Sequence, residues 1–244
     1  MKYLWANILG ALIFAGVNLA VFVLKKDKFK VIRNIALVVI CIILLSFKTI
    51  EYAYYQIMGM HHKVPMELSQ IAYFLFPISY LVSRKTQKML PIGAFTALLA
   101  GVFFNVGWIA SAKTFFERDT VYQLITASVF HNALYFGGML VLSTIKLPSK
   151  QFWHMPIGLA QIVCWHYLMH AVLVNDKDVV LKNVCEAKIL DYVWPNISQN
   201  TIFVVTYYVV VLLGLGVLIA LFYYSNYLFN KNNTIGKIEE CNYS

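Results

Sequence analysis

Charged residues are scarce in this sequence, and their scarcity excludes an ordinary soluble domain. Asp, Glu, Lys and Arg make up 13% of the 244 residues, against about 25% in a typical soluble domain. Hydrophobic residues make up 60%, and the mean hydropathy is +0.68. The sequence therefore predicts a polytopic membrane protein, whose many Phe and Tyr side chains contact lipid and the membrane interfaces.

Cysteine and phosphate-binding motifs are equally sparse. The four cysteines show no CxxC spacing, and Cys41 and Cys164 lie inside apolar runs, so neither a disulfide framework nor a zinc site is indicated. There is no Gly-rich phosphate loop. The net charge of +9 does not indicate a nucleic-acid surface, because the basic residues stand at the ends of apolar segments. We therefore expect no metal, no cofactor and no nucleic-acid partner.

Long apolar runs dominate the rest of the chain. A membrane-spanning helix needs roughly 20 apolar residues, and seven runs qualify. They are residues 3–24, 31–58, 64–82, 90–110, 121–145, 155–174 and 201–229. Pro65 favours a helix start in the third run. The fold class is thus all-α, with a seven-helix transmembrane domain over residues 1–230 and a short polar tail over residues 231–244.

Two further features of the apolar runs bear on the class of protein: the nature of the first run and the lack of internal repeats. The first run lacks an A-x-A-like cleavage site and is followed by "KKDKFKVIR", which is typical of a stop-transfer flank rather than a signal peptide. No internal repeat stands out, which argues against an inverted-repeat transporter.

The distribution of Lys and Arg predicts an orientation. Twelve lie in the loops after the first, third and fifth runs and in the C-terminal tail, seven lie at the N-terminus and in the other loops, and Lys48 lies inside the second run. By the positive-inside rule, the N-terminus is outside and the C-terminus is cytoplasmic. We expect a multi-pass protein of the cell membrane that has membrane lipids as partners.

Polar residues inside the runs mark the candidate site. Measured along each helix at ~1.5 Å per residue, most of them fall in the outer half or near the midplane. Polar groups in lipid must face one another or water, so the sequence predicts one polar pocket that opens outward. Its members are Lys48, Glu51, Glu67, Ser69, Gln70, Asn105, His131, Asn132, His166 and His170.

Each of these residues also has a plainer interpretation. Lys48 and Glu51 are three residues apart on one helical face and can neutralise each other as a local ion pair. His166 and His170 have i, i+4 spacing that can bind a metal, but HExxH is absent, so packing or hydrogen bonding is favoured. His131 can be a neutral core histidine, and Asn105 can join two helices.

Glu67 and Ser69 cannot face the same direction. Residues i and i+2 point ~200° apart on a helix, so Glu67 shares a face with Gln70, whereas Ser69 shares a face with Tyr73. Ser69 costs little to bury and is the better candidate for facing the interior, although its hydroxyl can also bond its own helix. Glu67 is shallow enough to reach water.

Three motifs carry a family resemblance: "VPMELSQ" (64–70), "FHN" (130–132) and "HYLMHAVLVND" (166–176). A Pro followed four residues later by a small nucleophile, with a lone His in a later span, resembles the YwaF-type bacterial membrane proteins. These are relatives of human transmembrane protein 164 and, more distantly, of the androgen-induced hydrolases of fatty-acid esters. The resemblance implies a multi-helix fold. It implies acyl transfer between lipids through a Cys and a His for the human relative, and a Thr and a His for the hydrolases.

By motif match, Ser69 takes the position of the family's Cys and His131 that of the base. A Ser needs stronger activation than a Cys. Asn132, Gln70 or Lys48 can donate hydrogen bonds to an oxyanion, and Glu51 can orient a His. The resemblance thus implies an intramembrane acyltransferase or ester hydrolase. The alternatives are a protein that binds or transports a small molecule or an ion, and a non-catalytic scaffold.

Overall fold

The computed structural model of the chain describes residues 3–61, 63–82, 88–118, 120–148, 152–172, 180–192 and 194–241. Within these residues all regular structure is helical. The α-helices are α1 (Leu4–Leu24), α2 (Lys30–Ile57), α3 (Leu68–Val82), α4 (Leu90–Arg118), α5 (Val121–Thr144), α6 (His154–Val172), α7 (Val180–Cys185) and α8 (Thr201–Cys241), and the short 3-10 turns are η1 (Asp27–Phe29), η3 (Lys188–Tyr192) and η4 (Ile197–Gln199). The all-α prediction is confirmed.

Each predicted span coincides with a helix, but the helices differ in length and polarity. Five of them, α1, α2, α4, α5 and α8, are long and apolar enough to cross a membrane. α3 has 15 residues, and α6, with 19 residues, is not among these five. The most apolar windows of α1 and α8 are 11% and 6% buried, so most of their apolar side chains face outward. Such surfaces are stable only in contact with lipid, which indicates an integral membrane protein.

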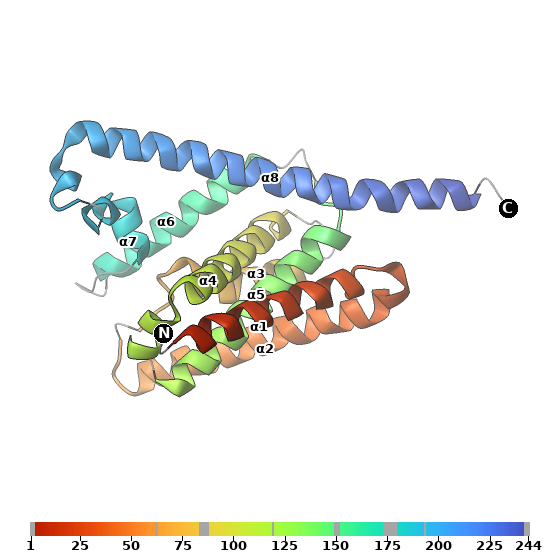
Figure 1. Cartoon of the computed structure of the whole chain (residues 1–244), viewed down its shortest axis with the longest axis horizontal. Helices are drawn as coiled ribbons and strands as arrows, with labels where there is room; N and C mark the ends of the chain where they lie inside the picture. Colours follow the sequence, from red (N-terminus) through yellow and green to blue (C-terminus); the bar gives the residue numbers. More distant parts are fainter. Residues whose placement is uncertain are drawn as a thin grey trace.

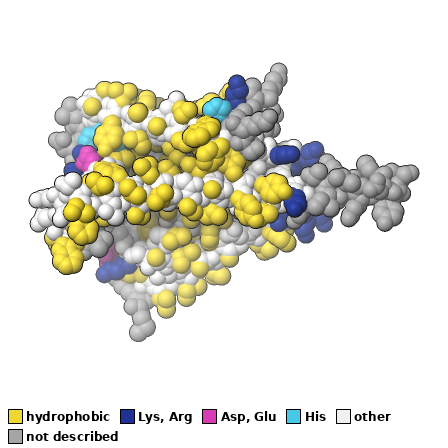
Figure 2. Space-filling model, turned by 90° about the horizontal axis from the view of Figure 1, so that it is seen from above, with side chains coloured by type: hydrophobic (Ala, Val, Ile, Leu, Met, Phe, Trp, Pro, Cys, Tyr) yellow, Lys and Arg dark blue, Asp and Glu magenta, His cyan; other side chains and the backbone are white. Residues whose placement is uncertain are grey.

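The long helices run back and forth between two ends of the molecule (Figure 1). The N-terminus and the α2–α3 and α4–α5 connections lie at one end. The α1–α2 connection lies at the other end, in the direction in which α8 extends. Figure 2 shows Lys and Arg side chains gathered towards this second end, which we call the basic end.

Helices α3, α4 and α5 form the centre of the bundle. Their buried side chains include Phe76, Phe95 and Leu134. A Cβ atom at Gly138 of α5 would lie 3.0 Å from the carbonyl oxygen of Ala94 in α4. Only a residue without a side chain permits this approach, which is typical of helix packing in membranes.

Polar contacts tie the outer helices to this centre. The indole nitrogen of Trp108 in α4 donates to the carbonyl oxygen of Ala6 in α1 at 2.9 Å. In α8, the Asn226 amide donates to the carbonyl oxygens of Leu142 and Ile145 at 2.7 and 2.8 Å and accepts from the Leu147 amide at 3.0 Å. Asn226 thereby satisfies backbone groups that the C-terminus of α5 leaves without helical partners.

Helix α3 begins at Leu68, so the predicted start near Val64 is wrong. The indole nitrogen of Trp165 donates to the carbonyl oxygen of Pro65, and Nδ1 of His166 lies 3.0 Å from the carbonyl oxygen of Met66. These bonds to α6 hold the preceding residues in a non-helical segment. The first helical bond is from the Ile71 amide to the Glu67 carbonyl.

Two other predicted spans continue further as helix. The fourth was predicted to end at residue 110, but α4 reaches Arg118 across a break at Ser111, where φ is −151° and ψ is 58°. The side chain of Asn7 in α1 accepts from the Ala112 amide at 3.1 Å, which satisfies one donor beside the break. α8 continues through the predicted tail to Cys241. Residues 173 and 174 of the sixth span lie outside the described residues.

Candidate functional site

His131 and Tyr73 form the central contact between α5 and α3. The Tyr73 hydroxyl lies 3.0 Å from Nδ1 and 3.3 Å from Nε2 of His131, and Nδ1 lies 2.8 Å from the carbonyl oxygen of Ala127. A carbonyl only accepts hydrogen bonds, so the short contact to Ala127 assigns the ring proton of neutral His131 to Nδ1. Nε2 then carries the lone pair, and the Tyr73 hydroxyl donates to it.

Aromatic rings enclose this contact. The His131 ring stacks on Phe104 of α4, with 4.3 Å between centroids and 10° between planes. Phe130 packs edge-on to Tyr73 at 6.0 Å. Tyr73 is 4% exposed. The rings hold His131 in one orientation and keep the basic Nε2 away from bulk water.

Lys48 and Glu51 of α2 adjoin this aromatic cage. The Lys48 ammonium lies 2.7 Å from Glu51 Oε2, and Tyr55 donates to Glu51 Oε1 at 3.4 Å. The same ammonium lies 4.6 Å from the centroid of the Tyr73 ring and 4.7 Å from that of Phe130. The local ion pair inferred from the sequence is therefore present, and the aromatic faces stabilise its cation further.

Ser69 lies on α3 one turn before Tyr73 and is half-buried. The hydrogen bonds recorded for His131 go to Tyr73 and Ala127, and no hydrogen bond joins Ser69 to His131 in the described structure. The predicted nucleophile and base are thus not joined by a hydrogen bond among the described residues. Their catalytic roles stay a prediction.

Gln70 and Glu67 organise the start of α3. The Gln70 side chain accepts from the Met66 and Glu67 amides at 2.9 and 3.0 Å, which is the backward bond of a capping box. Glu67 Oε2 accepts from the Leu181 amide of α7 at 3.1 Å. In this structure Gln70 therefore caps a helix, and Glu67 holds the extramembrane helix α7 against α3.

His166 and His170 of α6 form a second polar group beside that start. His166 is fully buried, and its Nδ1 contacts the Met66 carbonyl. The two ring centroids are 6.0 Å apart, and Nε2 of each ring is buried with no hydrogen-bond partner among the described residues. Among the described residues no group of three or more His, Cys, Asp or Glu is placed to hold a metal.

The two predicted asparagines bond mainly within their own helices. The Asn105 amide donates to the Gly101 carbonyl, and the Asn132 amide donates to the Ser128 carbonyl, both at 2.8 Å. The side-chain oxygen of Asn132 is buried without a partner.

The predicted residues therefore do not form one continuous hydrogen-bonded network. One group surrounds His131 with Lys48 and Glu51, and the other surrounds the start of α3 with His166 and His170; both adjoin α3. Of the three cavities described for this structure, none is lined by any of the ten. Two further residues that matter were missed. Tyr73 was placed on the Ser69 face but received no role. Asn226 is a polar residue inside the seventh predicted span, the same signal that marked the other candidates, but it was not included among them.

Outside the membrane-spanning helices, a compact turn joins η3 to η4. Asp191 accepts from the hydroxyl and the amide of Ser198 at 2.6 and 2.9 Å. The hydroxyl contributes most, followed by the amide, to holding the pKa of the Asp191 carboxyl below its usual value. The pKa of Glu186 is lowered by its hydrogen bond to Lys188.

Comparison with protein-family models, with curated proteins and with solved structures finds no match to this chain. The geometry of the site is therefore the basis for assigning a function.

Proposed function

We propose that the chain crosses the cell membrane seven times, with the N-terminus outside and the C-terminus in the cytoplasm. The alternating helix directions and the basic end support this arrangement (Figures 1 and 2). Helix α3 is ~22 Å long, shorter than the ~30 Å hydrocarbon core. The non-helical residues before it complete the span, because Trp165 and His166 satisfy the carbonyls of Pro65 and Met66.

Within this fold, we infer that the protein is an intramembrane enzyme that transfers or hydrolyses lipid acyl groups. The observation that carries the proposal is the buried contact between Tyr73 and the basic Nε2 of His131. A neutral imidazole held by a backbone carbonyl is a suitable general base. Side chains of a helix lean towards its N-terminus, which directs the Tyr73 ring towards the turn that carries Ser69.

The reaction follows from these positions. Ser69 attacks the ester carbonyl of a lipid while its proton passes through the Tyr73 hydroxyl to His131 Nε2. The protonated His131 returns the proton, by the same route, to the departing alkoxide. An acyl-Ser69 ester remains, and an incoming hydroxyl or water repeats the sequence to release the acyl group. Lys48, beside the Tyr73 ring, stabilises developing negative charge on the tyrosine oxygen or the substrate.

The resemblance to the YwaF-type family supports the same residues, because Ser69 and His131 fall on its motif positions. Tyr73 explains how a Ser can replace the Cys at that position. A hydroxyl nucleophile needs an adjacent base, and the Tyr73–His131 pair provides a proton path to one.

A second candidate function is the binding or transport of a small polar molecule or an ion. The Lys48–Glu51 pair favours it, since ionisable residues inside a membrane also mark ion and proton paths. Proton- or ion-dependent uptake into vesicles that contain the purified protein would support this candidate over the enzyme. A third possibility, a non-catalytic scaffold, predicts that replacing the polar residues changes stability alone.

The experiment is lipid turnover by the purified full-length protein in mixed micelles. We expect Ser69→Ala and His131→Ala each to abolish turnover and the double variant to be no worse, because residues that act as a unit are non-additive. Ser69→Cys should keep activity and become sensitive to thiol alkylation. Ser79→Ala is the matched control, because the Ser79 hydroxyl only bonds the Phe76 carbonyl of its own helix. Wild-type turnover by Ser69→Ala would exclude the enzyme proposal.

A further inference from the structure

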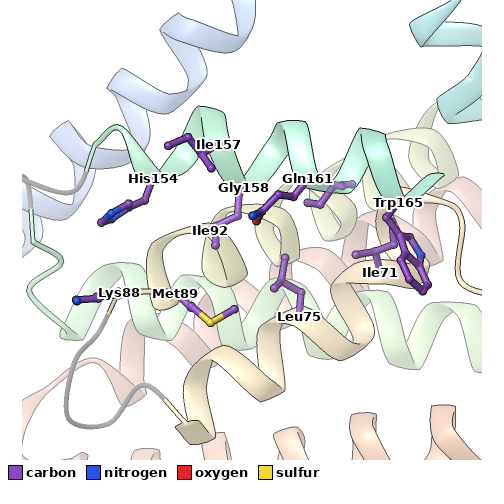
Figure 3. A pocket seen from close by; sticks show the side chains of 11 residues that line it. Ile71, Leu75, Lys88, Met89, Ile92, His154, Ile157, Gly158, Gln161 and Trp165 are labelled. Atoms are coloured by element: carbon purple, nitrogen blue, oxygen red, sulfur yellow. The ribbon is translucent and has the colours of Figure 1, made fainter. Parts of the chain in front are cut away.

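A groove on the surface of the bundle lies between α3, α4 and α6 (Figure 3). Ile71 and Leu75 of α3, Ile92 of α4, and Ile157 and Trp165 of α6 supply much of its apolar lining. Its volume is about 350 Å³, within the range of small-ligand sites.

The basic residues of the groove lie together at one end, and the neutral side chain of Gln161 lies between them and Trp165. Lys88 and His154 lie at one end, whereas Trp165 lies at the other (Figure 3). Lys88 lies two residues before the start of α4, and His154 begins α6, so both stand at the basic end. Both side chains are exposed, and neither has a hydrogen bond or ion pair recorded within the described residues. Two basic groups are therefore available to a ligand at this end.

The length of the groove matches one leaflet of a membrane. His154 and Trp165 are eleven residues apart on α6, which corresponds to ~16 Å along the helix. Half of the hydrocarbon core measures ~15 Å. The apolar lining thus runs from Lys88 and His154 towards Trp165 over a length comparable with the acyl region of one leaflet.

Two contacts determine the position of α6 beside this groove. A Cβ atom at Gly158 would lie 2.8 Å from Cγ1 of Ile92, so the missing side chain lets α6 approach α4. At the far end, the Trp165 indole donates to the Pro65 carbonyl at 2.9 Å. α6 is thereby anchored to α4 and to the segment before α3, with the groove between these contacts.

We propose that the groove binds one anionic phospholipid of the leaflet at the basic end. Lys88 and His154 hold the phosphate by charge-assisted hydrogen bonds, and an acyl chain lies along the apolar lining towards Trp165. The lipid is anionic because the basic side chains are matched by no acidic residue in the lining. A zwitterionic headgroup would bring its own cation beside them.

This lipid site is separate from the proposed catalytic residues. Ile71 and Leu75 are each two residues from Tyr73, and residues at that spacing point ~200° apart. The groove and the His131 contact therefore lie on different faces of α3. The inference depends on the membrane location of the chain and not on the acyl-transfer reaction.

The test measures lipid binding to the purified, delipidated full-length protein by native mass spectrometry, with phosphatidylglycerol and phosphatidylcholine as probes. We expect phosphatidylglycerol to bind about tenfold more tightly, on the scale of charge-assisted contacts. Replacing both Lys88→Gln and His154→Gln should remove this preference. Lys28→Gln is the matched control, because Lys28 is exposed at the same end but lies outside the groove. An unchanged preference in the double variant would overturn the proposal.

A second variant tests the acyl-chain position. Ile157 is 57% exposed at the groove, so Ile157→Trp fills the groove without disturbing the α6–α4 contact. Gly158→Leu, by contrast, would disturb that contact. We expect Ile157→Trp to weaken phosphatidylglycerol binding while thermal stability is retained. Equal binding by Ile157→Trp, or equally tight binding of glycerol phosphate without acyl chains, would exclude a lipid occupant of this groove.

Discussion

The hydroxyl of Tyr73 donates to Nε2 of His131 across the interface between α3 and α5, at 3.3 Å. Because Nδ1 is held by the Ala127 carbonyl, this bond reaches the ring nitrogen that can accept a proton. The contact connects the face of α3 that bears Ser69 to a base on a different helix. Its chemical role can be separated from its packing role by removing one oxygen atom.

Tyr73→Phe should lower lipid turnover by about 10²-fold, the lower end of general acid–base effects, with little change in KM. The ring and its contacts with Lys48 and Phe130 are retained, so the fold should be stable. Steady-state kinetics measure the effect. Tyr52→Phe is the control, because no hydrogen bond is recorded for the Tyr52 hydroxyl among the described contacts. Full activity in Tyr73→Phe would contradict a relay.

Lys48 and Glu51 should behave as a coupled pair. Removing one partner of a buried ion pair leaves an uncompensated charge, at a cost of about 3 kcal/mol. Lys48→Met should therefore lower the free energy of unfolding more than Lys48→Met combined with Glu51→Gln. Thermal or denaturant unfolding in detergent measures all members of the cycle. Additive losses would show that the two side chains are not energetic partners.

Asn226→Leu should destabilise the attachment of α8 to α5. The substitution leaves the Leu142 and Ile145 carbonyls and the Leu147 amide without their partner, and each unsatisfied buried group costs about 1–3 kcal/mol. We expect a loss of about 3 kcal/mol or more in unfolding free energy. Thr206→Val on the same helix should change stability little, since Thr206 is exposed and bonds the Ile202 carbonyl of its own helix. Equal stability of the two variants would contradict this role for Asn226.

The turn at Asp191 should loosen in acid. Its pKa is lowered in the folded protein, so its stabilising contribution is present above the unfolded value of about pH 4. That contribution is lost as the pH falls from there through the folded pKa. The protection of the Ser198 amide, its exchange rate relative to the intrinsic rate at the same pH, should fall over this range. Asp191→Asn should show low protection already at neutral pH. If the protection of that amide from exchange in the wild type does not change with pH, the carboxylate does not hold the turn.

The predicted topology can be tested by reporter fusions. A fusion after Lys146 or at Ser244 should report the cytoplasm, and a fusion near Asp178 should report the outside. The reason is the excess of Lys and Arg in the connections on one side. Opposite signals would invert the orientation and place the start of α3 on the cytoplasmic side.

Much of the helical framework could be predicted from the sequence, because it depends on local properties. The length and hydropathy of each run predict a helix, and the observed bounds of α1, α2 and α5 differ by one residue or less from those predicted. The Lys48–Glu51 pair is equally local, since residues three apart on a helix face each other. The start of α3 was predicted wrongly because its preceding carbonyls bond to α6, 100 residues away.

The sequence by itself thus determined an all-α membrane protein and the set of polar residues inside its helices. Only the tertiary structure decided how those residues are paired. Tyr73 and His131 are 58 residues apart, and Asn226 is 84 residues from Leu142. In an environment without water, a buried polar group bonds whichever partner the packed helices bring near it. That choice depends on helix rotation and depth, which the order of residues along one helix does not specify.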